Sequence, residues 1–243
     1  MRNFVNYLFI SMVCIGCAST STLKPYPDQI NPILQHVIDD KSINVNREFL
    51  NKDKTKDKAL YFLEQGRVAQ IKGEIFQSQK AFAKALEAIK NLDNKAIYSA
   101  SGAVAQGSSI LVNDNALPYM VQGYERVMLH QFQAFNYLYQ QDIKGAGVEI
   151  RRANAQQEIS LKKHQAEITK VKETNRSNKL NDTLPTTVNE AYAKNDLSIA
   201  QLKNSFQNAY SFYFSGLVYE LLGEDNDAYI DYKKALEIYP QNS

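Results

Sequence analysis

Residues 209–242, AYSFYFSGLVYELLGEDNDAYIDYKKALEIYPQN, alternate large and small side chains at fixed distances. Two groups recur at intervals of three or four residues: Phe212, Gly216 and Tyr219, then Ala228, Tyr232 and Ala235. Residues spaced in this way share one face of an α-helix. The stretch therefore predicts two helices, with a left-handed turn at Gly223 and a stop at Pro240. The small residues allow the two helices to approach closely.

The spacing of this stretch resembles the tetratricopeptide repeat (TPR). Counted from Ala209, seven residues occupy positions 4, 8, 11, 20, 24, 27 and 32 of a 34-residue unit: Phe212, Gly216, Tyr219, Ala228, Tyr232, Ala235 and Pro240. The resemblance implies helical hairpins that stack into an α-α superhelix, whose first helices line a concave surface.

The same pattern recurs from Ala59 and from Val127. The first copy contains Phe62, Gly66, Ala69, Ser78, Phe82 and Ala85, with Gly73 at the turn. The second contains Ala134, Tyr137, Ala146, Ile150 and Ala153, with His130 at position 4 and Gly145 near the turn. We therefore expect an all-α domain over residues 33–243, with repeats near 59–92, 127–160 and 209–242. The alternative is a generic amphipathic bundle that matches the pattern by chance.

Between the first two copies, residues 93–126 keep the phase of the repeat but not its pattern. They read as a helix from about residue 95 to 112, followed by a loop. A polar insert at 160–190 follows the second copy, with a charged helix expected over 154–172 and a loop over 174–187. Its Lys, Arg and His side chains suggest a phosphate or lipid-headgroup site. The interspersed acids favour a solvated helix face instead.

Composition narrows the function classes. Gly and Pro total only 16 of 243 residues, which favours helix over many turn-linked strands, and 26 Tyr and Phe side chains argue against disorder. The 28 Lys and Arg side chains nearly balance the 26 acids, so nucleic-acid binding is not expected. The two cysteines, Cys14 and Cys17, both lie in the first seventeen residues, which leaves no Cys-based metal site.

The first residues predict a lipid anchor. A short basic start precedes an apolar stretch from Phe4 to Ile15, which is too short to remain as a membrane-spanning helix. Residues 14–17, Cys-Ile-Gly-Cys, resemble the lipobox of bacterial lipoproteins, although Cys14 stands where Leu or Val is usual. The resemblance implies a signal peptide over 1–16, acylation (palmitate-type lipid) of Cys17, and a tether over 17–32. The alternatives are an ordinary cleaved signal and an N-terminal membrane helix.

The residue after Cys17 is Ala18 rather than Asp, which resembles the sorting choice of outer-membrane lipoproteins. We therefore expect an outer-membrane protein, anchored by its lipid and facing the periplasm.

Catalytic motifs are absent from the sequence. It contains no Gly-rich phosphate loop, no HExxH and no GxSxG, so no cofactor, metal site or enzymatic activity is expected. His130, at a packing position of its helix, reads as a core or groove histidine rather than as a metal ligand. The alternative is an envelope enzyme acting on glycan or peptidoglycan, with acidic, basic and His candidates at Asp114, Glu125, Arg126, His130, Asp142 and Glu149.

Residues 111–126 stand out by their Asn-Asp-Asn and Leu-Pro-Tyr sequences, which predict a turn and an extended segment before a new helix. Either this loop shapes a recognition site with Tyr119 and Tyr124, or it is a packed connector. Together with residues 130–154, it resembles an uncharacterised family of TPR lipoproteins from Gram-negative bacteria. The likeness covers about residues 55–160 and the last repeat. Such lipoproteins tend to be encoded beside another that resembles activators of penicillin-binding proteins, which implies a role in cell-envelope assembly.

By resemblance to the TPR, positions 2, 5, 9, 12 and 13 of each first helix face the groove. Together with the two loop tyrosines, we expect partner contacts from Leu63, Arg67, Tyr119, Tyr124, Gln131, Phe135, Tyr139, Tyr210, Tyr213 and Leu217. The function predicted is a scaffold that binds a protein or peptide partner of the cell envelope. A purely structural subunit of an outer-membrane lipoprotein or secretion complex requires the same kind of surface and remains an alternative.

Overall fold

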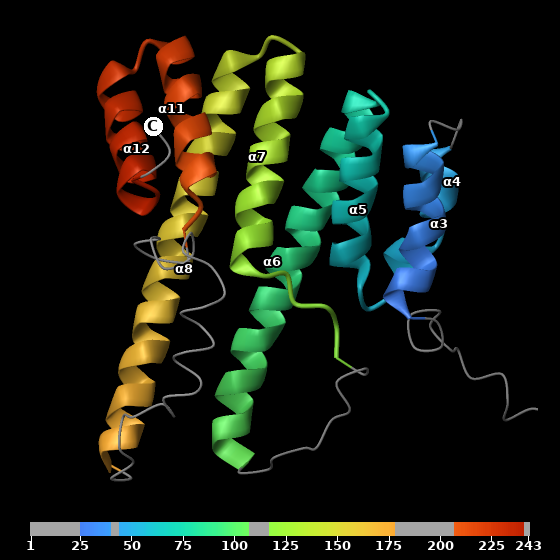
Figure 1. The fold of residues 1–243 in the computed structure, drawn as a ribbon. Coiled ribbons are helices and arrows are strands. Elements are labelled where there is room, and N and C mark those ends of the chain that lie inside the picture. Colours follow the sequence, from blue (N-terminus) through green and yellow to red (C-terminus); the bar gives the residue numbers. More distant parts are fainter. Residues whose placement is uncertain (1–24, 40–43, 107–116, 178–206, 241–243) are drawn as a thin grey trace, which may run out of the picture. The chain divides into compact units, whose positions relative to one another are not determined.

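The computed structural model describes residues 25–39, 44–106, 117–177 and 207–240. This part of the chain contains helices and turns but no strand, which confirms the predicted all-α class for it (Figure 1). The chain divides into two compact units, Met1–Met120 and Val121–Ser243. The predicted signal peptide, Cys17, Asp114 and residues 178–190 of the polar insert lie outside the described residues.

The described part of the second unit consists of two helical hairpins. Its described helices are α7 (Gly123–Tyr139), α8 (Ile143–Ser177), α11 (Ala209–Leu222) and α12 (Asp225–Ile238). Helix α7 packs against α8, α11 packs against α12, and α11 also lies along α8 (Figure 1). The predicted windows 127–160 and 209–242 therefore each fall on a pair of packed helices.

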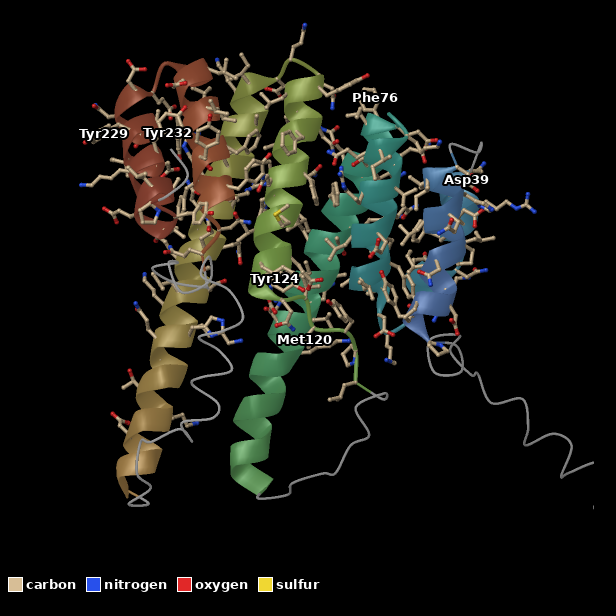
Figure 2. All side chains as sticks on the ribbon, in the orientation of Figure 1. Asp39, Phe76, Met120, Tyr124, Tyr229 and Tyr232 are labelled. Carbon is tan, nitrogen blue, oxygen red and sulfur yellow. The ribbon has the colours of Figure 1, made fainter. Side chains whose placement is uncertain are left out.

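The last hairpin has the turn and the close approach that its sequence predicts. Gly223 ends α11 with φ 74°, and its N–H donates to the carbonyl of Glu220 at 3.0 Å. A Cβ atom on Gly216 would lie 2.6 Å from Cδ1 of Tyr232, which is labelled in Figure 2. Only glycine allows the Tyr232 ring to lie this close to the backbone of α11.

The turn between α7 and α8 lies near Gly145, as expected, and its left-handed residue is not a glycine. Gln141, with φ 61°, takes that conformation, whereas Gly145 lies within the first turn of α8. A Cβ atom on Gly145 would lie 2.5 Å from Cδ1 of Tyr137. The glycine is therefore needed for packing between the helices and not for the turn.

The core of the second unit joins both hairpins. One cluster of buried side chains contains Ala134, Ala146, Ile150, Phe214, Val218, Tyr219 and Ala228. These residues come from all four described helices of this unit. Burying a large aliphatic or aromatic side chain contributes about 1.5–3 kcal/mol, so this cluster links α11 and α12 firmly to α7 and α8.

Helix α8 runs on for 35 residues, well past the predicted repeat. The charged helix expected over 154–172 is confirmed, and the exposure of Lys162, Lys163 and Lys170 fits the predicted solvated face. Residues 174–177, expected in a loop, are helical. The Lys, Glu and Gln side chains that are frequent in this stretch favour helix.

The first unit holds the remaining hairpin, α5 (Lys58–Ile71) and α6 (Ile75–Gln106). Gly73, with φ 75°, makes the predicted turn between them. A Cβ atom on Gly66 would lie 2.6 Å from the Phe82 ring, the same close approach as in the last hairpin. The separate helix expected from about residue 95 is wrong: α6 continues without a break through the described residues to Gln106.

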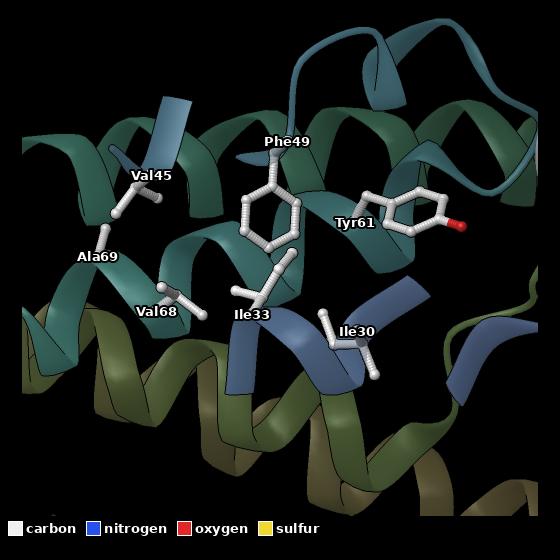
Figure 3. Packing of buried hydrophobic residues seen from close by; sticks show 7 residues of the cluster. All are labelled: Ile30, Ile33, Val45, Phe49, Tyr61, Val68 and Ala69. Carbon is white, nitrogen blue, oxygen red and sulfur yellow. The ribbon is translucent and has the colours of Figure 1, made fainter. Parts of the chain in front are cut away.

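Among the described residues, three shorter elements precede this hairpin: α3 (Tyr26–Ile38), α4 (Val45–Glu48) and the 3-10 helix η1 (Lys52–Lys54). Apolar side chains of α3 and α4, together with Phe49 directly after α4, pack on α5 in a core of Ile30, Ile33, Val45, Phe49, Tyr61, Val68 and Ala69 (Figure 3). Residues 26–32, expected in the tether, therefore belong to a helix. Pro27 is tolerated there because the first turn of a helix needs no amide donor.

Tyrosine hydroxyl groups add polar links within this core. The Tyr61 hydroxyl donates to Oε1 of Gln29 at 2.7 Å, and the Tyr26 hydroxyl donates to Glu64. Burial and the neighbouring Glu64 carboxylate raise the pKa of Tyr26 well above its usual value. Helix α3 is thus fixed on α5 by side-chain hydrogen bonds as well as by apolar packing.

Candidate functional site

The first helices of the second unit carry a row of large exposed side chains. Tyr139, near the end of α7, is 73% exposed, and Tyr210, Tyr213, Leu217 and Leu221 on α11 are each between 39% and 59% exposed. All five stand at positions that the sequence assigned to the groove. We name this set, Tyr139, Tyr210, Tyr213, Leu217 and Leu221, the first-helix surface.

Two predicted contact residues of α7 do not belong to this surface. Gln131 is 1% exposed, and its amide atoms have no hydrogen-bond partner among the described residues. The ring of Phe135 is half-buried and packs on Phe214 with centroids 4.4 Å apart. The prediction that Gln131 faces a partner is therefore wrong, and Phe135 packs at least one face of its ring on α11. The physical reason is that α7 is buried around most of its circumference, unlike a simple amphipathic helix.

In the first unit, the predicted contact residues Leu63 and Arg67 lie on α5. Leu63 is half-buried, and Arg67 is exposed. The guanidinium of Arg67 donates to Oε1 of Gln70, one turn along the helix, at 2.8 Å. Partial burial lowers the pKa of Arg67 below its usual value. The guanidinium is thus held against its own helix and partly shielded from solvent, although the side chain as a whole is exposed.

The two loop tyrosines belong to different units. Tyr119 is half-buried, and its backbone N–H donates to Oδ1 of Asp57 at 2.8 Å. Lys56 donates from Nζ to the carbonyl of Leu117 at 2.8 Å, which fixes the same segment to the start of α5. Tyr124, labelled in Figure 2, is exposed in the first turn of α7. For Tyr119 the structure favours the packed connector over the recognition loop.

The acids considered for catalysis make local structural contacts. Oε2 of Glu125 accepts the backbone N–H of Gln122 at 2.7 Å, which stabilises the first turn of α7. Oδ1 of Asp142 accepts the N–H of Gly145 at 2.8 Å at the start of α8. Nε of Arg126 donates to the carbonyl of Val121 at 3.2 Å.

His130 takes part in a chain of polar contacts between α7 and α8. Its Nδ1 lies 2.7 Å from Oε2 of Glu149, and Oε1 of Glu149 accepts from Arg152 at 2.7 Å. His130 and Glu149 are both nearly fully buried. This is the core histidine that the repeat position predicts. Among the described residues, no group of three or more His, Cys, Asp or Glu side chains could hold a metal ion.

A second polar network joins α8, α11 and α12, and it was not predicted from the sequence. Asn154 donates from Nδ2 to Asp231, and its Oδ1 accepts from Oγ of Ser215 at 3.3 Å. Lys234 donates to Oδ1 of Asp231 at 3.2 Å. Burial raises the pKa of Asp231, although Lys234 and Asn154 act in the opposite direction. The sequence feature that could have indicated this network is Asp231, an acid directly before Tyr232 on the inner side of the predicted helix.

The chain matches no protein-family model, and no curated protein matches it. Within the described ranges, every helix is too short or too polar to cross a membrane.

Proposed function

We propose that this chain is a lipid-anchored scaffold that faces the periplasm and binds a protein or peptide partner of the cell envelope. The observation that carries the proposal is the first-helix surface, where three tyrosines and two leucines are exposed on α7 and α11. Tyrosine is enriched at the centre of protein interfaces because it buries a large area at a small cost in conformational entropy.

In this proposal the three hairpins are tetratricopeptide repeats. Support comes from the same close approach in two of them, Gly66 against Phe82 and Gly216 against Tyr232. In each pair the glycine is at position 8 of the repeat, on its first helix, and the aromatic residue is at position 24, on its second helix. Packing of Tyr219 and Phe214 with residues of α7 and α8 supports stacking of the hairpins within the second unit.

The lipid anchor rests on Cys17 and on the apolar residues before it. Three acyl chains would hold the protein at a membrane, because each buried methylene contributes about 0.8 kcal/mol. Intact-mass measurement of the protein from its native membrane tests the anchor. A mature chain that begins at Cys17 and carries lipid supports it, and a mature chain that retains residues 1–16 contradicts it.

Two matched tyrosine variants test the binding surface. Tyr139 on α7 and Tyr229 on α12 are both highly exposed, at 73% and 68%, but only Tyr139 belongs to the first-helix surface. We expect Tyr139→Ala to lose a partner that the wild-type chain co-purifies from envelope extracts, whereas Tyr229→Ala retains it. Far-UV circular dichroism should show the same helicity in both. Equal loss or equal retention of the partner in both variants contradicts the proposed surface.

A further inference from the structure

An open cavity of about 580 Å³ lies on the last hairpin, between α11 and α12. Its walls include Tyr210, Tyr213, Tyr232, Ala235, Leu236 and Tyr239. The rings of Tyr213 and Tyr232, which both line the cavity, contact each other with centroids 5.6 Å apart. Burial and a hydrogen bond to Glu220 raise the pKa of Tyr232 to about 12, so its hydroxyl stays protonated and directed at that carboxylate. The surface offered is therefore mainly apolar, with one acid at its edge.

The preceding hairpin, α7 and α8, shows which element covers the repeat positions that line the cavity. The two repeat windows begin at Val127 and Ala209, so a shift of 82 residues relates them. Under this shift the α12 residues of the cavity correspond to α8 residues as follows: Tyr232 to Ile150, Ala235 to Ala153, Leu236 to Asn154, and Tyr239 to Gln157. Ile150, Ala153 and Gln157 are at most 1% exposed, whereas Leu236 is 53% exposed.

Helix α11 is the element that covers these α8 positions. Ile150 packs in one cluster with Phe214 and Val218 of α11. Asn154 accepts from the Ser215 hydroxyl at 3.3 Å. Gln157 accepts the backbone N–H of Asn208, directly before α11, at 2.6 Å. These α8 positions are thus covered by helix α11, whereas the equivalent positions on α12 line the open cavity.

The two sites differ in chemistry. The amide anchors Asn154 and Gln157 of the covered site correspond to Leu236 and Tyr239 in the open one. A helix that occupies the open site must therefore present an apolar face and needs no polar group to satisfy an amide. An amphipathic helix fits this site, because docking of such a helix into an apolar groove is a recurrent mode of peptide recognition.

The charge of the last hairpin adds a second requirement. Residues 207–240 carry six acids and two lysines, although the whole chain has a net charge of +2. The acids are Glu220, Glu224, Asp225, Asp227, Asp231 and Glu237. Of the two lysines, Lys234 is paired with Asp231 and Lys233 is exposed. A partner helix with basic flanks complements the negative charge of this hairpin better than one with acidic flanks.

We propose that the cavity between α11 and α12 receives an amphipathic α-helix of a partner protein, apolar on its docking face and basic on its flanks. The inference goes beyond the proposed function, because it adds the second helix α12 to the binding surface. It shares Tyr210 and Tyr213 with the first-helix surface, whereas Leu236 and Tyr239 belong to the cavity alone.

A synthetic helix provides the probe. It has Leu and Ala on one face, Lys on both flanks, and a single Trp on the apolar face. The protein contains no tryptophan, so Trp emission reports the peptide alone. We expect saturable binding with a blue shift to the chain from Ala18 to Ser243, which retains every described residue. A peptide with Glu in place of each Lys should bind about tenfold more weakly at low salt.

Matched lysine substitutions on α12 locate the peptide. Leu236→Lys should weaken its binding about tenfold or more, because it places a charge in the apolar site. Tyr229→Lys makes the same change of residue on an exposed part of α12 outside the cavity, and should stay within about twofold of wild type (Figure 2). Circular dichroism and thermal unfolding check that both variants fold. Leu217→Ala, which alters only the first-helix surface, should leave peptide binding unchanged even if it loses the proposed envelope partner.

Three results would overturn the inference. The first is no saturable binding of the lysine-flanked peptide, or equal binding of the glutamate-flanked one. The second is equal binding to the Leu236→Lys variant and the wild type. The third is a wild-type dimer in sedimentation that Leu236→Lys dissociates, which would make a second copy of this chain the occupant.

Discussion

The side-chain oxygen Oε1 of Gln157 accepts the backbone N–H of Asn208 at 2.6 Å. The contact joins α8 to the residue that precedes α11, across 51 positions of sequence. Gln157 is fully buried, and the Asn208 side chain in turn accepts the N–H of Ser211 at the start of α11. One amide group therefore fixes where the last hairpin begins.

Gln157→Ala should destabilise the chain by about 2–3 kcal/mol, because it leaves a cavity and removes the acceptor of the Asn208 N–H. Gln156→Ala, at the half-buried neighbouring position, should change the free energy of unfolding by less than about 0.5 kcal/mol. Urea unfolding followed by circular dichroism measures both. Equal effects of the two substitutions would show that the contact with Asn208 contributes nothing.

Gly216→Ala should also destabilise the chain, although alanine is the better helix former by about 1 kcal/mol. The added methyl group would meet the Tyr232 ring, and overpacking of this kind costs about 1–3 kcal/mol. In the Gly216→Ala/Tyr232→Ala double variant the loss should be smaller than the sum of the single losses. A stabilising Gly216→Ala substitution would mean that α11 and α12 are not packed this closely.

Asp231→Asn should flatten the pH dependence of stability. Folding raises the pKa of Asp231 through burial, so the folded state favours the protonated carboxyl. The resulting stability is present below the unfolded-state value near 3.8 and decreases as the pH rises through the folded-state pKa. Asparagine keeps an acceptor for Asn154 but cannot ionise.

The measurement for Asp231 is the melting temperature of both proteins at about pH 3.5 and pH 7. The melting temperature of the variant minus that of the wild type should increase from about pH 3.5 to pH 7. A difference that stays constant contradicts the raised pKa, and a difference that decreases would mean that the charged carboxylate stabilises the fold through Lys234.

Much of the fold is predictable because helical hairpins are encoded locally. Gly216 and Tyr232 lie only sixteen residues apart, so their spacing indicates both helices and the close approach between them. Gly223 and Gly73 predicted the left-handed turns because few other residues adopt that conformation readily. At Gln141 a non-glycine residue takes this conformation, which is not predictable from its residue type.

The candidate site was less predictable, because exposure depends on contacts between distant parts of the chain. The repeat position of Gln131 indicated an exposed groove residue, yet α7 is buried on several sides. Tyr139, the last residue of the same helix, is exposed as predicted. The pairing of Asn154 with Asp231 was not predictable from spacing, because it joins α8 to α12 across 77 positions of sequence.

The most direct test of the scaffold account is photo-crosslinking in intact cells, from a photoreactive side chain placed at position 217. Leu217 lies on the first-helix surface, and exposed Lys144 on the second helix α8 supplies the control position. The account predicts that position 217 crosslinks to one envelope protein in high yield, identified by mass spectrometry, and that position 144 does not. The same crosslinks at the same yield from both positions, or none from 217, would contradict it.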